Sequence, residues 1–226
     1  IWKTNNVRAH KLAGYSVVNI SLTQLGTAPG DATSDQMRMI AGLADKYSNS
    51  ELRTTKRQNL VFPYVRQDQV YALWQELEKS DLASPHNGTL AHVVACPGGD
   101  YCDLAKAVSI PIAQQVQQRF DDMDKLYDIG PININISGCE NSCAHHHISD
   151  IGLLGLKKKE EEFYQITLAG ETLNETAIGR KLGRSIAGSE VVDAIEDIVN
   201  IYLDNREEGE NFVDVFKRIG FTPFKE

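Results

Sequence analysis

The chain has 226 residues, of which 42% are hydrophobic and 24% are charged. This composition is typical of a soluble globular protein with a sizeable core, and it excludes a largely disordered chain. The formal net charge of −8 and the lack of a basic stripe argue against nucleic acid as a partner. No apolar stretch approaches the roughly 18–20 residues that a membrane-spanning helix needs, so we expect no membrane partner.

The first part of the chain shows the pattern of a small β-α-β-α module. Residues 15–22 alternate and are rich in Val and Ile, which predicts a strand. Thr33, with Gln36 three residues later, predicts a capping box at the start of a helix. The apolar face of that helix has helical spacing: Met37, Ile40, Ala44 and Tyr47. Two further elements are expected, an extended region and a second helix: residues 51–64 and 70–77.

A boundary is indicated at residues 80–88, which contain Ser84-Pro85 and Asn87-Gly88 and no apolar periodicity. We therefore expect two domains, residues 1–84 and 85–226. The second domain is expected to contain strands over 92–95 and 132–136, a helix over 104–120 that Pro111 starts or kinks, a hairpin of 151–156 and 163–168, a helix over 191–202 with Ser189 as its cap, and a last helix over 212–219 closed by Gly220.

Four cysteines, the only ones in the chain, form two close pairs. Cys96 and Cys102 follow the expected strand 92–95, and Cys139 and Cys143 follow the expected strand 132–136. Placement at strand ends lets two distant loops converge, and glycines beside each pair allow the backbone to approach a ligand closely. Soft sulfur ligands select iron–sulfur clusters or zinc, and four of them complete a 4Fe–4S cluster.

The rival interpretations of the cysteines are zinc and disulfides. Structural zinc sites favour two to four residues between paired ligands, which the Cys96–Cys102 spacing exceeds. Disulfide frameworks belong mostly to small secreted domains that lack a core. An iron–sulfur cluster is therefore the preferred interpretation, and a zinc-stabilised structural domain stays open.

Two polar groups have both a functional and a structural interpretation. His145, His146 and His147 follow Cys143 directly and either face a cofactor or anion or alternate between packing and solvent. The cations of residues 53–57, Arg53, Lys56 and Arg57, either bind an anionic substrate or lie on an exposed strand. The run of lysines and glutamates at 157–162 is expected to be a solvated turn, since its charges cancel.

The cysteine motifs and their surroundings resemble the sirohaem-dependent nitrite and sulfite reductases. The resemblance covers nearly the whole chain and rests on these segments: Cys96-Pro97-Gly98, Gly138-Cys139-Glu140-Asn141-Ser142-Cys143, Asp150-Ile151-Gly152, Pro29-Gly30-Asp31, Thr54, Gln58-Asn59-Leu60 and the C-terminal helix pair. It implies an α+β fold, with a ferredoxin-like half-domain followed by a mixed α/β sirohaem and 4Fe–4S domain. It further implies that the chain is the C-terminal, cluster-bearing half of a longer enzyme, which fits a start at Ile1 without methionine.

The resemblance assigns roles to individual residues. Cys96, Cys102, Cys139 and Cys143 would hold the 4Fe–4S cluster, Cys143 would also bridge to the sirohaem iron, and Asn141 would contact the sirohaem. Glu140 departs from the family, which often has proline at this position. The family's substrate-gripping Arg and Lys residues lie mainly in the other half, and no matching strand is found here.

The implied activity is the six-electron reduction of nitrite to ammonia or of sulfite to sulfide. The implied partners are the N-terminal half of the same polypeptide, an electron donor (a ferredoxin or a flavoprotein) and a small anionic substrate, and the implied location is the cytoplasm. The alternative is a 4Fe–4S electron-transfer module without sirohaem or catalysis.

Overall fold

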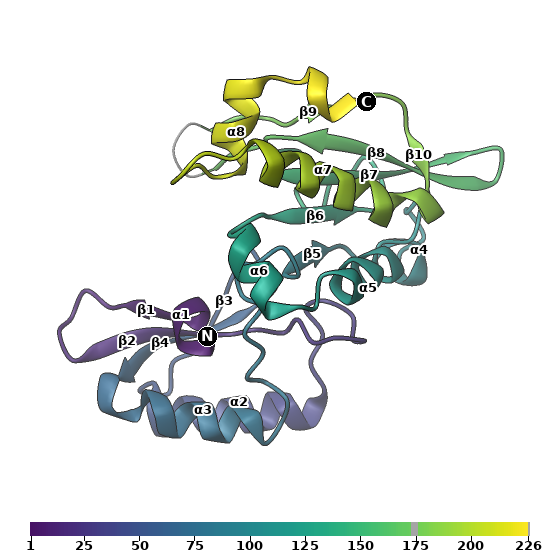
Figure 1. Cartoon of the computed structure of the whole chain (residues 1–226). Helices are drawn as coiled ribbons and strands as arrows, with labels where there is room; N and C mark the ends of the chain where they lie inside the picture. The colour runs from purple at the N-terminus through teal and green to yellow at the C-terminus, as the bar shows by residue number, and fades with distance from the viewer. Residues whose placement is uncertain (173–175, 226) are drawn as a thin grey trace. The chain divides into compact units, whose positions relative to one another are not determined.

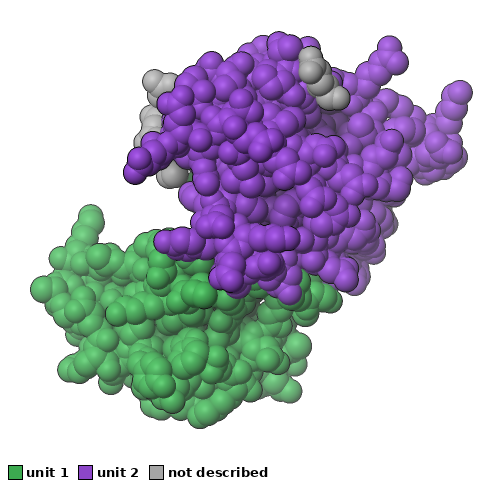
Figure 2. Space-filling view, viewed as in Figure 1, with its two compact units in different colours: residues 1–87 green, residues 88–226 purple. Residues whose placement is uncertain are grey.

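The computed structural model describes residues 1–172 and 176–225. It divides the chain into two compact units, residues 1–87 and 88–226 (Figures 1 and 2). The first unit extends past the expected boundary at residue 84 because hydrogen bonds hold the following segment to it. Asn5 Nδ2 donates to Pro85 O over 2.8 Å, and Asn59 Nδ2 donates to Asn87 Oδ1 over 3.0 Å.

The first unit consists of one antiparallel sheet with helices. Its elements are α1 (Trp2–Asn6), β1 (Val7–Ala9), β2 (Tyr15–Ile20), α2 (Ser34–Tyr47), β3 (Arg53–Thr54), β4 (Leu60–Arg66), the short 3-10 helix η1 (Gln67–Gln69) and α3 (Val70–Glu78). The strand order is β1-β2-β4-β3, and α2 and α3 lie together on one face of the sheet (Figure 1). The expected β-α-β-α pattern is therefore present, preceded by α1 and β1.

The helix α2 starts where its capping box predicts. Thr33 Oγ1 accepts a hydrogen bond from Gln36 N, and Gln36 Oε1 accepts one from Thr33 N, so two backbone donors at the helix start are satisfied. Ile40, Ala44 and Tyr47 are buried as expected, whereas Met37 is largely exposed. The apolar stripe of α2 thus packs on the sheet from its second turn onward.

The second unit contains a mixed sheet of six described strands. The strands are β5 (Val93–Ala95), β6 (Ile134–Ser137), β7 (Ile151–Lys158), β8 (Glu161–Leu168), β9 (Arg180–Lys181) and β10 (Ile186–Ala187). The order is β10-β8-β7-β6-β5, with β9 paired to β8. The strands β5, β6 and β7 run parallel, whereas β8 is antiparallel to β7 and forms the expected hairpin with it.

Helices cover the sheet of the second unit. They are α4 (Gly98–Tyr101), α5 (Ile110–Arg119), α6 (Met123–Ile129), α7 (Val191–Asn205) and α8 (Phe212–Ile219), with the short 3-10 helices η2 (His146–Ile148), η3 (Gly188–Glu190) and η4 (Thr222–Lys225). The helices α5 and α7 lie side by side over one face of the sheet (Figure 1). Their apolar side chains and those of the strands form one core.

Two sequence predictions need correction, and one helix was missed. The helix expected over 104–120 begins only at Ile110, with Pro111 in its first turn, because the preceding segment uses its backbone groups to bind the loop after β6. Ser189 does not cap α7, whose N-cap position is Glu190. The helix α6 was not predicted, although Asp122 Oδ1 caps it by accepting from Asp124 N and Lys125 N. Gly220 closes α8 with φ of 77°, as expected.

Candidate metal centre

The four cysteines lie on two loops that leave neighbouring parallel strands. Cys96 directly follows β5, and Cys139 follows β6 after Gly138. The strands are in register with Ala95 opposite Ile136, and parallel neighbours end at the same edge of a sheet. The convergence expected from the sequence therefore follows from strand pairing, and Cys96 N donates to Ile136 O over 3.1 Å.

The two loops touch through their glycines. Gly138 N donates to Cys96 Sγ over 3.1 Å. A Cβ at position 138 would lie 3.0 Å from Gly98 Cα and 2.7 Å from Ala107 O. Only glycine permits this approach, and Gly98 has in addition a φ of 60° that other residues rarely adopt. The glycines beside the cysteines thus lock one loop to the other.

The four thiols are free and differ in exposure. Cys139 is buried, Cys96 and Cys102 are half-buried, and Cys143 is exposed. Cys96 and Cys102 are separated by the single turn of α4, which closes when Cys102 N donates to Gly98 O over 2.9 Å.

The segment 139–147 folds into successive tight turns. Ser142 N donates to Cys139 O over 3.1 Å and His145 N to Ser142 O over 2.7 Å, with φ values of 56° at Ser142 and 53° at His145. Asn135 Nδ2 anchors the segment to β6 by donating to Ala144 O over 2.7 Å. Asn141 lies on the first of these turns and Cys143 on the second, and both residues are exposed.

The three histidines alternate in exposure. His145 is exposed, His147 is half-buried and His146 is buried, with the rings of His146 and His147 edge to face at 5.4 Å. Burial, and next to it the neighbouring His147, lowers the pKa of His146 to about 4. His146 is therefore neutral at physiological pH, as the packing interpretation of this segment predicts.

Polar atoms without a protein partner lie beside the cysteine loops. Among the described residues, none hydrogen-bonds to Asn135 Oδ1, Ser137 Oγ or His146 Nδ1, although each atom is buried. Asn135 and Ser137 are two positions apart on β6 and so share a face of the sheet. Buried polar atoms in native proteins normally form hydrogen bonds with protein, water or ligand. A bound water or polar ligand would therefore satisfy these atoms.

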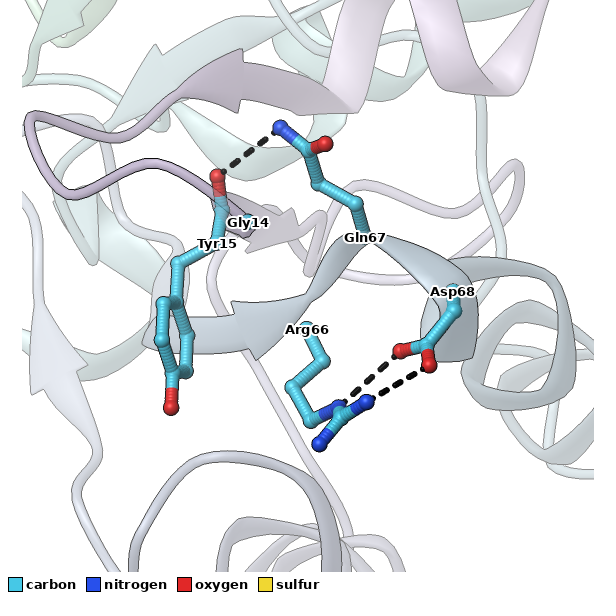
Figure 3. A pocket seen from close by; sticks show the side chains of 5 residues that line it. All are labelled: Gly14, Tyr15, Arg66, Gln67 and Asp68. Atoms are coloured by element: carbon cyan, nitrogen blue, oxygen red, sulfur yellow. Dashed lines mark hydrogen bonds and ion pairs between the residues drawn. The ribbon is translucent and has the colours of Figure 1, made fainter.

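Among the cations of residues 53–57, Arg53 is bound to a carboxylate of the chain itself. Arg53 is exposed on β3 and binds Glu51 through Nε, which donates to Oε1 over 2.6 Å. A separate shallow pocket in the same unit contains Arg66, and there both Nε and one terminal nitrogen bind the Asp68 carboxylate over 3.1 and 2.8 Å (Figure 3). The guanidinium groups of Arg53 and Arg66 are thus committed to carboxylates of the chain itself.

Within residues 1–172 and 176–225, no three His, Cys, Asp or Glu side chains are gathered tightly enough to surround one metal ion. A single zinc ion needs its ligands on one tetrahedron, whereas each cysteine of a 4Fe–4S cluster binds a different iron.

None of the helices in the described part of the chain is long and apolar enough to cross a membrane.

Together, the two units form an α+β protein whose second unit carries both cysteine loops at the ends of neighbouring parallel strands. The family model of the nitrite and sulphite reductase 4Fe-4S domain matches residues 88–226, and that of the nitrite/sulfite reductase ferredoxin-like half domain matches residues 20–80. The chain therefore belongs to the nitrite and sulfite reductase family, and the expected fold class is confirmed.

Individual relatives agree with this membership. The chain is 30% identical over 203 residues to sulfite reductase (ferredoxin) 2 of Mycolicibacterium paratuberculosis, a match that covers 84% of this chain and 36% of the relative. It is 27% identical to the chloroplastic ferredoxin–nitrite reductase of Betula pendula, covering 85% of this chain and 33% of the relative. The chain thus spans about a third of the length of these relatives.

Solved structures show the same fold. The structure of the Mycobacterium tuberculosis NirA protein matches with a TM-score of 0.73 at 26% identity, covering 97% of this chain and 41% of that one. A dissimilatory sulfite reductase I (DsrI) also gives a TM-score of 0.73, at 15% identity, covering 93% of this chain and 68% of that one. The second match supports the fold alone.

Proposed function

We propose that this chain is the 4Fe–4S- and sirohaem-carrying half of an assimilatory nitrite or sulfite reductase, which reduces nitrite to ammonia or sulfite to sulfide with six electrons. The observation that carries the proposal is the pair of cysteine loops joined by the Gly138 N–H to Cys96 Sγ bond, within the segment that matches the family's 4Fe-4S domain. The domain assignment accompanies it, with a ferredoxin-like half-domain before the boundary and the cofactor domain after it.

Cys96, Cys102, Cys139 and Cys143 would hold the cluster. The donor set fits, since four free thiols supply the four thiolates that a 4Fe–4S cluster requires. Backbone N–H groups directed at ligand sulfurs are a further requirement of such sites, and Gly138 N supplies one to Cys96. The close approach of Gly98 and Gly138 holds the two ligand pairs in fixed relation.

Cys143 would bridge the cluster to the sirohaem, and Asn141 would contact the sirohaem. Cys143 is the exposed member of the set, as a thiolate shared with a second group outside the loop must be. When bound, the sirohaem supplies the iron at which the anion is reduced. The residues of this chain would position that group, and Cys143 would be the residue shared between it and the cluster.

We assign substrate binding and electron supply to partners of this chain. Small anions such as nitrite and sulfite need cationic side chains, and the guanidinium groups of Arg53 and Arg66 are already paired. We therefore assign the substrate-binding cations to the N-terminal half of the same polypeptide, in keeping with relatives about three times as long. Relatives named for ferredoxin favour ferredoxin over a flavoprotein as the electron donor. We propose the cytoplasm as the location.

The cluster assignment is tested by anaerobic reconstitution of the chain with iron and sulfide, followed by quantification of both per chain. A 4Fe–4S cluster gives about four irons and four sulfides. The matched control carries serine at all four cysteine positions and should take up neither. Fewer than about two irons in a well-folded sample would contradict the proposal, and one zinc without iron would favour a structural zinc domain.

The sirohaem assignment is tested on the full-length protein by its absorption spectrum with and without nitrite and sulfite. A sirohaem band that one anion perturbs supports a reductase and identifies the substrate. A 4Fe–4S spectrum without that band would instead favour the electron-transfer module.

A further inference from the structure

Ser109 lies at the start of α5, where a serine side chain normally caps the helix, but the Ser109 side chain does not cap it. It is the N-cap residue of α5, where the serine side chain normally accepts a hydrogen bond from a backbone N–H, yet no such capping bond is formed. Pro111 in the first turn removes one of the N–H donors that a cap would satisfy. The fully buried hydroxyl of Ser109 is directed elsewhere.

The Ser109 hydroxyl binds Cys96. Oγ donates to Cys96 O over 2.9 Å and lies 3.4 Å from Cys96 Sγ. It reaches this position because residue 98 is glycine, since a Cβ there would lie 2.6 Å from Ser109 N and would collide with Ser109 Oγ. Cys96 Sγ therefore accepts a hydrogen bond from Gly138 N, and Ser109 Oγ, which donates to Cys96 O, lies within hydrogen-bond distance of the same sulfur.

The backbone before Ser109 is fixed to the second cysteine loop. Lys106 N and Ala107 N both donate to Gly138 O, over 2.8 and 3.1 Å, and Gly99 N donates to Ala107 O over 3.0 Å. This segment is thus hydrogen-bonded to the backbone beside both cysteine pairs. A residue that follows it directly is held at a set distance from Cys96.

The strand β8 also holds the backbone directly before Ser109, through hydrogen bonds to Val108. Tyr164 OH donates to Val108 O over 2.6 Å, and Val108 N donates to Glu162 Oε2 over 3.2 Å. Burial, reinforced by Glu162, raises the pKa of Tyr164 well above its usual range, so its hydroxyl keeps its proton and remains a donor. Both backbone groups of Val108 are satisfied, which leaves Ser109 little freedom to turn away from Cys96.

We propose that Ser109 is a positioning residue for Cys96 and that its hydroxyl raises the reduction potential of the bound cluster. The inference rests on the proposed function, in which Cys96 is a cluster ligand. A ligating cysteine is a thiolate without a proton, so of the two side chains only the serine can then donate. Its single hydrogen then turns from Cys96 O to the anionic sulfur, in a hydrogen bond that is strengthened by charge, and this bond stabilises the more negative, reduced state more than the oxidised one.

The test is a mediated redox titration of the reconstituted 226-residue chain, followed by electron paramagnetic resonance. Ser109→Ala removes the hydroxyl and should shift the cluster potential to a more negative value. Ser109→Thr retains a hydroxyl and should titrate close to the wild type. Ser189→Ala, at an exposed serine before α7, is the matched control and should not shift. A Ser109→Ala potential equal to that of the wild type would overturn the inference.

Cluster loading separates the remaining outcomes. Loss of the cluster from Ser109→Ala but not from Ser109→Thr would support the role of the hydroxyl through ligand positioning. Loss of the cluster from both variants would overturn the role of the hydroxyl, because side-chain volume and not the hydrogen bond would then determine whether the cluster binds. A wild-type chain that takes up no iron would overturn the proposed function itself, whereas a loaded wild type with an unshifted Ser109→Ala contradicts only the role of Ser109.

Discussion

The backbone N–H of Gly138 donates a 3.1 Å hydrogen bond to Cys96 Sγ, joining residues 42 positions apart in the chain. The bond connects the loop of the second cysteine pair to a sulfur of the first. Each loop therefore depends on the other for its position, and a disturbance of either glycine contact should be detected at both pairs.

Gly138→Ala is expected to destabilise the chain and to lower cluster loading. The added Cβ would lie 2.7 Å from Ala107 O and 3.0 Å from Gly98 Cα, and both neighbours are backbone atoms fixed by hydrogen bonds. Overpacking of this kind costs about 1–3 kcal/mol. Urea denaturation gives the free energy of unfolding, and iron per chain gives the loading.

The matched control for this substitution is Gly42→Ala. Gly42 lies inside α2, where a Cβ would meet no atom within 4 Å. Alanine has the higher helix propensity, so this variant should be more stable by about 0.5–1 kcal/mol. Equal effects of the two substitutions would contradict the argument from close approach.

Cys143→Ser should abolish coupling between the cluster and the sirohaem. Cys143 is exposed, so its replacement should leave the fold intact, with a far-ultraviolet spectrum like that of the wild type. In the full-length protein we expect loss of haem–cluster coupling in the electron paramagnetic resonance spectrum, together with loss of activity. Coupled spectra in this variant would show that another cysteine bridges.

His146 should make the stability of the cofactor-free chain depend on pH between about 6.5 and 4. Burial and the neighbouring His147 lower its pKa from 6.5 to about 4. A depressed folded-state pKa means stability that is present above about pH 6.5 and is lost as the pH falls through 4. His146→Phe should flatten the urea midpoint across this range. His145→Asn, at an exposed position whose positive φ asparagine tolerates, should not.

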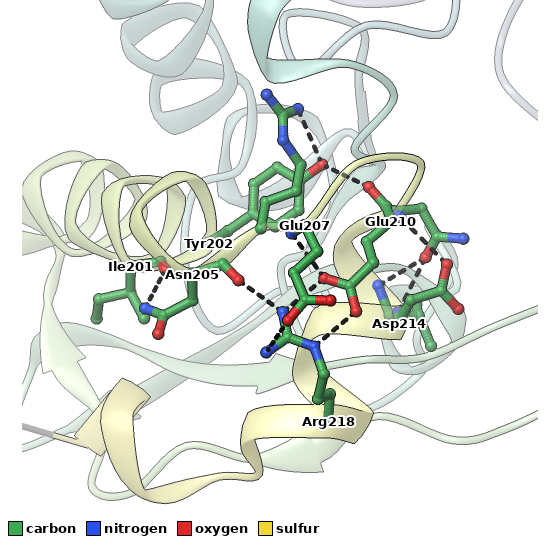
Figure 4. A network of polar contacts seen from close by, with 10 residues as sticks. Ile201, Tyr202, Asn205, Glu207, Glu210, Asp214 and Arg218 are labelled. Carbon is green, nitrogen blue, oxygen red and sulfur yellow. Dashed lines mark hydrogen bonds and ion pairs between the residues drawn. The ribbon is translucent and has the colours of Figure 1, made fainter.

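Glu210 should contribute a second, more acidic dependence through the network at the end of the chain (Figure 4). Arg218 donates to both Glu210 carboxylate oxygens over 2.7 and 2.6 Å, and Glu207 N donates over 2.9 Å. The Arg218 bonds first, then the Glu207 N–H, lower the pKa of Glu210 from 4.5 to about 2. The stabilisation is therefore present above about pH 4.5 and is lost as the pH falls toward 2.

Glu210→Gln should reduce the loss of stability between pH 4.5 and 2, as measured by thermal unfolding at a series of pH values. Glu208→Gln, at an exposed glutamate of the same loop, is the control and should retain the wild-type profile. Parallel profiles for Glu210→Gln and the wild type would show that the Arg218 pair does not act through ionisation of Glu210.

Elements with strong local signals were predicted from the sequence. The Thr33 capping box placed the start of α2, and the segments 151–156 and 163–168 on either side of the lysine–glutamate turn placed the hairpin of β7 and β8. Elements with weak signals were missed. The strand β1 has only three residues, one of them Arg8, and it exists because it pairs with β2.

The sequence by itself determined the family, the four cysteines and their placement after two strands, because ligand chemistry and spacing are local properties of the chain. Only the tertiary structure decided how these parts meet. The contact of Gly98 with Gly138 and the turn of the Ser109 hydroxyl toward Cys96 depend on the parallel pairing of β5 with β6. Ser109 stands at the N-cap of α5 but does not cap it. Its role changes because the pairing of distant strands brings a stronger hydrogen-bond partner to it than the end of its own helix offers.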